Sequence, residues 1–246
     1  MSDMKNKVAI VTGASRGIGA AIAERLGHDG FTIIVNYAGN AALADAVVNK
    51  IEASGGIARA AQADVADPAA VKRMFDAAED AFGGVDVLVN NAGIMTLSPL
   101  ATTEDVDFDK LVSVNLKGTF NTMREAGKRL RDNGRIINFS TTVVGLKLEN
   151  YGVYAATKAA VETLTAIMAK EMRGRNISVN AVAPGPTATD LFLDGKSEEL
   201  VKRMAKMSPL ERLATPEDIA GVVAFLAGPD GAWVNGQTLR ANGGII

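Results

Sequence analysis

The regular alternation of short apolar runs with longer helix-forming stretches is the feature that most constrains the fold of this chain. Seven runs are rich in Val, Ile, Leu and Ala and have the length of strands. Several are continuously apolar, which suits a sheet that is covered on both faces. We predict strands at Val8–Thr12, Phe31–Asn36, Ile57–Ala63, Val85–Asn90, Arg135–Ser140, Ile177–Ala183 and Gln237–Ala241.

Helical patterns fill the intervals between these strands. We predict helices near Gly17–Gly30, Ala41–Ser54, Pro68–Phe82, Glu104–Arg131, Gly152–Arg173 and Pro216–Ala227. This repeated order predicts an α/β fold, a Rossmann-type doubly wound parallel sheet of about seven strands with helices on both faces. No linker divides residues 1–246, so we expect a single domain. The one long irregular insertion, at about 187–208, is expected to form a mobile lid beside a ligand.

Composition narrows the possible partners. The 246 residues, 48% of them apolar, are enough to bury a sizeable core. The 26 basic and 28 acidic residues form no basic block, so we expect a small-molecule partner, with no nucleic acid and no membrane. There is no cysteine, and no His, Asp or Glu cluster has metal-ligand spacing, so we predict no metal site. The polar start and the lack of a long apolar run predict a cytoplasmic protein without a signal peptide or membrane span.

A glycine-rich turn follows the first predicted strand. Its sequence is Thr12-Gly13-Ala-Ser-Arg16-Gly17-Ile-Gly19. Without Cβ atoms this backbone can approach a pyrophosphate, whose charge would face the free N–H groups of the next helix. The spacing is G-x-x-x-G-x-G and not the usual G-x-G-x-x-G, so the glycines could equally serve tight-turn packing.

Tyr154 and Lys158 stand four residues apart inside a helix-forming run. Four residues make about one helical turn, so both side chains project from one face. A cation held beside a phenol favours the phenolate and lowers its pKa, which makes the pair suited to acid–base chemistry. The alternative is that this spacing arises by chance on a solvated helix face.

Five motifs together resemble the classical short-chain dehydrogenase/reductase family. They are the glycine turn, Asn90-Asn91-Ala92-Gly93 after the fourth strand, Asn115 in the following helix, Tyr154-x-x-x-Lys158, and Pro184-Gly185 after the sixth strand. The match extends from Lys7 to Gly244. Within the family the chain is most similar to the 3-oxoacyl-acyl-carrier-protein reductase-like members, including the Asn242-Gly243-Gly244 ending.

The resemblance implies a role for each matching position. Tyr154 would exchange a proton with a carbonyl or alcohol oxygen, and Lys158 would lower its pKa and hold the nicotinamide ribose. Asn115 would hold a water that links Lys158 to solvent; the alternative is a side chain bonded to the helix backbone. The implied cofactor-binding residues are Gly13, Ser15, Arg16, Gly17, Ile18, Gly19, Asn36, Tyr37, Asp64, Val65, Asn91, Ala92, Gly93, Tyr154, Lys158, Pro184, Gly185, Thr187 and Thr189.

One position departs from the family pattern. The family places a serine thirteen residues before the tyrosine, where its hydroxyl can polarise the substrate carbonyl. Counting back thirteen from Tyr154 reaches Thr141, whereas aligning on Gly145 reaches Thr142, and the serine present is Ser140. A threonine can donate the same hydrogen bond, so all three remain candidate catalytic residues.

Cofactor choice depends on the end of the second strand, where a carboxylate would bind the adenosine ribose and repel a 2′-phosphate. This chain has Asn36-Tyr37 there, and Arg16 in the glycine turn could pair with a phosphate, although it could also be a solvated charge. Both features favour NADP(H) over NAD(H). By family analogy Asp64-Val65 would bracket the adenine, unless Asp64 serves only as a cap.

We therefore expect an NADP(H)-dependent oxidoreductase that interconverts a ketone and a secondary alcohol. The substrate is a small carbonyl or alcohol compound, or an acyl thioester, held by residues 94–100, 143–153 and 187–208. The alternative is a catalytically weak, dinucleotide-binding regulator with the same fold. The resemblance suggests a homotetramer that uses the apolar helix around Ala155–Met168 and the tail Gln237–Ile246. His28, near a helix end beside Asp29, is not expected to be catalytic.

Overall fold

The computed structural model describes residues 7–246, and the polar segment 1–6, in which we expect no signal peptide, lies outside them. Seven parallel strands form one sheet in the order β3-β2-β1-β4-β5-β6-β7. The strands are β1 (Val8–Val11), β2 (Thr32–Tyr37), β3 (Ile57–Gln62), β4 (Val85–Asn90), β5 (Leu130–Phe139), β6 (Ser178–Pro184) and β7 (Thr238–Ala241). The order reverses between β1 and β4, which confirms the predicted doubly wound sheet.

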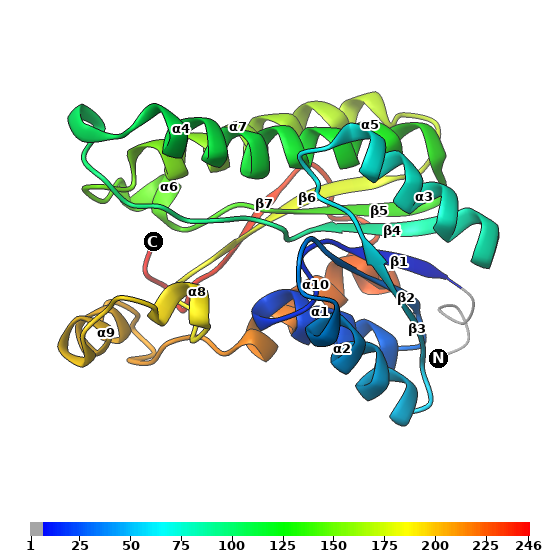
Figure 1. Cartoon of the computed structure of the whole chain (residues 1–246), viewed down its shortest axis with the longest axis horizontal. Coiled ribbons are helices and arrows are strands. Elements are labelled where there is room, and N and C mark those ends of the chain that lie inside the picture. The colour runs from blue at the N-terminus through cyan, green and yellow to red at the C-terminus, as the bar shows by residue number, and fades with distance from the viewer. Residues whose placement is uncertain (1–6) are drawn as a thin grey trace.

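Helices cover both faces of the sheet (Figure 1). One layer holds α1 (Gly17–His28), α2 (Ala41–Ala53) and α10 (Pro216–Ala227). The opposite layer holds α3 (Pro68–Phe82), α4 (Asp105–Leu111), α5 (Thr119–Arg129) and α7 (Gly152–Glu171). Side chains alternate along each strand, so Ala9 and Val11 of β1 enter one core cluster while Val8 and Ile10 enter the other. This explains why the central strands are apolar throughout.

The short helices lie in the connections. They are η1 (Leu100–Thr102), the π-helical segment η2 (Val112–Gly118), α6 (Val143–Leu146), α8 (Asp190–Leu193), α9 (Glu198–Ala205) and η3 (Pro229–Gly231). The single helix predicted over Glu104–Arg131 is wrong in two respects. It is divided by η2, and Leu130 and Arg131 already belong to β5 because Leu130 pairs with Val85 of β4. The predicted lid contains two helices, α8 and α9.

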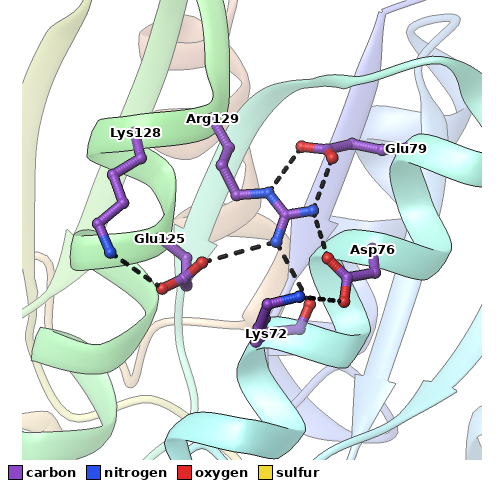
Figure 2. Close-up of polar contacts among 6 residues, drawn as sticks. All are labelled: Lys72, Asp76, Glu79, Glu125, Lys128 and Arg129. Carbon is purple, nitrogen blue, oxygen red and sulfur yellow. Dashed lines mark hydrogen bonds and ion pairs between the residues drawn. The ribbon is translucent and has the colours of Figure 1, made fainter.

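A network of charged side chains joins α3 to α5 (Figure 2). Arg129 of α5 donates to Glu79 and Asp76 of α3, at 2.6 and 2.8 Å, and its guanidinium lies over the Phe75 ring. The Arg129 side chain is only 16% exposed, which separates this network from ordinary surface ion pairs. The hydrogen bond to Glu79, followed by that to Asp76, raises the pKa of Arg129 against the effect of burial. The network anchors the helix that continues from η2.

Two kinds of feature are absent from the described part of the chain. Within residues 7–246 no helix is both long and apolar enough to cross a membrane. The same residues hold no group of three or more His, Cys, Asp or Glu side chains that could bind a metal ion.

Candidate active site

The predicted site residues gather at the carboxyl ends of the central strands. There a cavity open to solvent lies between the ends of β4, β5 and β6, the helix α6, the start of α7 and the predicted lid. The cavity adjoins the point between β1 and β4 where the strand order reverses, at the carboxyl ends of the strands, which is where doubly wound folds bind ligands.

The glycine turn leads from β1 into α1. Gly13 and Gly17 have φ values of 61° and 57°, which favour glycine. A Cβ at Gly19 would overlap the carbonyl oxygen of Gly13 and would lie 2.5 Å from Nδ2 of Asn91. Arg16 is the N-cap of α1 and gives no side-chain hydrogen bond to its first turn. The first-turn N–H groups, beside Ile18 in the cavity wall, are thus left for a ligand, which fits the pyrophosphate of a dinucleotide.

Thr12 and Asn91 hold this turn against the loop after β4. The Thr12 hydroxyl accepts from the backbone N–H groups of Asn91 and Ala92, at 3.1 and 3.0 Å. The Asn91 amide donates to the carbonyl oxygens of Thr12 and Gly13, at 2.9 and 3.0 Å. Asn91, through its side chain and backbone, and Ala92, through its backbone, therefore hold the glycine turn against the loop after β4.

Asn36 differs from the expectation. Its side chain is 1% exposed; Oδ1 accepts from the N–H of Gly13 and Nδ2 donates to the carbonyl oxygens of Ala61 and Ala63, at 3.1 and 3.0 Å. The buried amide thus links the glycine turn to β3 and has no donor free to contact a ribose. Tyr37 is the half-buried residue that follows.

The loop after β3 contains the predicted adenine-binding pair. Asp64 is exposed and accepts from the N–H of Ala66 at 2.9 Å, which is the capping role considered as its alternative. Val65 is buried against Gly118, and its carbonyl accepts from Asn121 of α5. The side chain of Val65 therefore packs into the protein, and Asp64 is the member of the pair that faces solvent.

Asn115 lies in the π-helical turn η2 and is fully buried. Its Oδ1 accepts from the N–H of Ile94, and its Nδ2 donates to the carbonyl of the same residue, both at 2.9 Å. The side chain thus binds the loop after β4 and not its own helix. A Cβ at Gly93 would lie 3.3 Å from this Oδ1 and 3.5 Å from Nζ of Lys158, so Gly93 leaves the space between them open.

Tyr154 and Lys158 line the cavity from the first two turns of α7, as predicted from their spacing. The electrostatics differ from the expectation. Burial raises the pKa of Tyr154 to about 12; a hydrogen bond with Thr141 offsets this in part, and Tyr151 adds to the rise. Burial lowers the pKa of Lys158 to about 8. The Lys158 ammonium donates a hydrogen bond to the carbonyl of Phe139 at 2.9 Å, so it binds the backbone at the last residue of β5.

The three candidate hydroxyls after β5 have different partners. Ser140 donates to Oε1 of Glu162 at 2.5 Å. Thr142 donates to the carbonyl of Ala183 at 3.3 Å. The Thr141 hydroxyl accepts from the N–H of Val143 at 3.3 Å, and of the three it is the one close enough to the phenol to lower the pKa of Tyr154, which favours the residue thirteen positions before the tyrosine.

The connection after β6 closes the cavity on its remaining side. Gly185 donates its N–H to the carbonyl of Ala241, and a Cβ there would lie 2.8 Å from the Cα of Asn242. The Thr187 hydroxyl donates to the carbonyl of Gly185, and Thr189 caps α8 by accepting from the N–H of Phe192. Pro184, Gly185, Thr187 and Thr189 all line the cavity.

Other predicted positions lie apart from the reacting groups. Ser15 is half-buried in the glycine turn, and Arg16 is exposed and lines a second groove with Lys196 and other residues near α8. His28 is exposed near the end of α1, away from the cavity lining.

Tyr151 was missed in the sequence. It precedes α7, lines the cavity and meets Tyr154 edge-on, with ring centroids 6.3 Å apart. Helix spacing could not have found it, because Tyr151 lies one residue before both the predicted helix and α7.

Comparison with known proteins identifies the family. The protein-family model described as enoyl-(acyl carrier protein) reductase matches residues 13–246 of this chain. A short-chain type dehydrogenase/reductase from Picea abies is 48% identical over 250 residues, which cover 98% of this chain and 92% of that protein. An NADPH-dependent aldehyde reductase-like protein, chloroplastic, from Arabidopsis thaliana is 46% identical, with 99% and 95% covered.

Solved structures agree with the sequence relatives. A short chain dehydrogenase from Burkholderia cenocepacia J2315 in complex with NADP is 38% identical, has a TM-score of 0.93, and is matched over 98% of each chain. The fold, the ordered motifs and these relatives together show that this chain belongs to the short-chain dehydrogenase/reductase family of oxidoreductases.

Proposed function

We propose that this protein is an NADP(H)-dependent reductase that interconverts a small aldehyde or ketone and the corresponding alcohol. The observation that carries the proposal is the placement of Tyr154 and Lys158 in one cavity with Thr141 against the phenol. The relatives add support, because one is named an NADPH-dependent aldehyde reductase-like protein and a similar structure holds NADP.

Three features of the chain fit NADP(H). The glycine turn leaves the first-turn N–H groups of α1 for the pyrophosphate. No carboxylate stands at the end of β2, where it would repel a 2′-phosphate. Arg16 is exposed beside the turn, where its guanidinium can turn toward a phosphate. The bound cofactor would supply the hydride that reaches the carbonyl carbon.

The residues of the chain supply the proton and the orientation. With its raised pKa, Tyr154 carries its proton at neutral pH and can donate it to the carbonyl oxygen. Thr141, on the other side of that oxygen, would donate a second hydrogen bond and polarise the carbonyl. Lys158 would bind ribose hydroxyls, and the added charge nearby would then lower the pKa of Tyr154. Asn115 fixes the Ile94 backbone through both polar atoms of its amide. A water held beside this segment would link Lys158 to solvent.

A substrate screen tests the proposal. Purified protein is incubated with NADPH or NADH and a panel of aldehydes, ketones and acyl thioesters, and loss of absorbance at 340 nm is followed. We expect oxidation of NADPH with uncharged aldehydes or ketones. No oxidation with any carbonyl compound, together with tight NADPH binding, would favour a regulator.

We also propose a homotetramer, a single functional domain and a lid formed by residues 187–208. Apolar side chains that a monomer would leave exposed to water support the homotetramer. Trp233 is 98% exposed, and Phe120, Ile167 and Phe225 are more than a third exposed. The lid proposal rests on α8 and α9, whose Phe192 and Met204 line the cavity.

A further inference from the structure

The cavity wall is apolar outside the reacting centre. Ile94, Leu146, Leu148, Met204 and Met207 are part of its lining. Lys158 is the one charged side chain that lines it within residues 7–246. Such a lining favours an uncharged, apolar substrate body, because a charged group would lose its hydration here without a partner.

Most polar side chains in the lining are already engaged with other protein groups. Their donors or acceptors are bonded within the fold, and they are Asn91, Ser140, Thr142, Lys158, Thr187 and Thr189. Thr141 faces Tyr154. In the described part of the chain, this leaves Tyr154, which the proposed reaction uses, and Tyr151, whose hydroxyl has neither a hydrogen-bond partner nor a role in that reaction.

Tyr151 is a fixed part of the cavity wall. The residue is half-buried, its backbone N–H donates to the carbonyl of Leu148, and its ring stacks edge-on against Tyr154. A phenylalanine would pack equally well, so packing does not explain the hydroxyl. Burial raises the pKa of Tyr151, so the hydroxyl keeps its proton at neutral pH and can donate it in a hydrogen bond.

We propose that Tyr151 is a specificity-determining residue that donates a hydrogen bond to a second, uncharged oxygen of the substrate, close to the carbonyl that Tyr154 protonates. The substrate class is then an apolar aldehyde or ketone with a neighbouring ether, hydroxyl or carbonyl oxygen. This rests on the proposed reductase function and narrows it. In the reaction, hydride from NADPH joins the carbonyl carbon and the Tyr154 proton joins its oxygen, giving the alcohol and NADP⁺, while the second oxygen is unchanged.

The test uses two ketones that differ by one oxygen: 2-methoxy-1-phenylethanone and 1-phenylbutan-1-one. Each has one reacting carbonyl, and the ether oxygen of the first replaces a methylene of the second. The ratio of their kcat/KM values is measured with NADPH for wild type and for Tyr151→Phe. Comparing the two ratios cancels the different intrinsic reactivity of the ketones.

We expect kcat/KM for 2-methoxy-1-phenylethanone, divided by that for 1-phenylbutan-1-one, to fall about fivefold in Tyr151→Phe. A change of this size is the effect of one neutral hydrogen bond. Thr163→Val is the matched control, since it removes one hydroxyl from the exposed face of α7 and should leave the ratio unchanged. If Tyr151→Phe leaves the ratio unchanged, the proposed role of Tyr151 is overturned and the reductase function remains. An equal loss of kcat/KM with both ketones also leaves the ratio unchanged and counts as this outcome. Failure of wild type to oxidise NADPH with either ketone, while other carbonyl compounds of the screen react, would overturn the substrate class proposed here and leave the reductase function standing; failure with every carbonyl compound would overturn both proposals.

Discussion

At the scale of single residues, the burial of Lys158 has a measurable effect on stability. Its pKa is about 8 in the folded protein and 10.5 in its ordinary state. Between these pH values the unfolded chain holds a proton that the folded protein has released, so the free energy of unfolding rises with pH. As the pH rises from 8 to 10.5, the free energy of unfolding of wild type should increase by roughly 3 kcal/mol more than that of Lys158→Met. Urea unfolding of both proteins measures this, and a pH-independent difference would refute the buried ammonium.

Asn36 gives a second prediction at this scale. In Asn36→Asp a carboxylate would replace the amide that donates to Ala61 and Ala63, so oxygen would face oxygen. We expect a loss of roughly 1–3 kcal/mol in the free energy of unfolding. Asn40→Asp is the control, because Asn40 is the exposed N-cap of α2 and aspartate caps equally well. Equal stability of the two variants would show that the Asn36 amide is not structural.

Arg16 is the residue that we expect to determine the preference for NADPH over NADH. If its guanidinium pairs with the 2′-phosphate, Arg16→Ala should weaken NADPH binding about ten- to a hundredfold and leave NADH binding unchanged. Fluorescence titration with both cofactors measures the two dissociation constants. A parallel loss for NADH and NADPH would instead place Arg16 at a group that both cofactors share.

At the scale of elements, the glycine turn is the most constrained segment. In Gly19→Ala the new methyl would overlap the Gly13 carbonyl and the Asn91 amide, both held by hydrogen bonds. We expect a loss of roughly 1–3 kcal/mol in stability and no measurable cofactor binding. Gly39→Ala meets nothing within 4 Å and should behave as wild type. Thermal unfolding with and without NADPH tests this, and a Gly19→Ala protein that NADPH still stabilises would contradict the packing described.

The elements also show what could be predicted from the sequence. The strands and most helices follow from the alternation of apolar runs with helix-forming stretches along the chain, as with α3 and α10, which begin at the predicted Pro68 and Pro216. The π-helical turn around Asn115 could not be foreseen, because the same residues fit a continuous helix. The start of β5 at Leu130 depends on pairing with β4, which is a tertiary contact.

Within the site, residue types were easier to predict than their environment. The spacing of Tyr154 and Lys158 and the position of Thr141 followed from counting along the chain. The pKa directions did not, because burial depends on how β5, α7 and the lid enclose the pair. The burial of the Asn36 amide was also hidden, since its partners lie on β3.

At the scale of the whole molecule, the exposed apolar side chains make oligomeric state a direct test. With Trp233 98% exposed and Phe225 40% exposed, burial against other copies would remove these rings from water. We expect sedimentation velocity to give a tetramer at micromolar concentration. Trp233→Ser should shift the distribution toward smaller species, and a wild-type monomer would refute the proposal.

In the proposed reaction, one cavity positions Tyr154 to give its proton to a substrate carbonyl oxygen. The direct measurement is kcat for NADPH-dependent reduction of 2-methoxy-1-phenylethanone by wild type and Tyr154→Phe, with the NADPH dissociation constant of each. Phenylalanine keeps the packing and lacks the proton, so we predict a fall in kcat of about 100-fold or more with nearly unchanged NADPH affinity. A Tyr154→Phe protein that retains more than about a tenth of wild-type kcat would contradict the account.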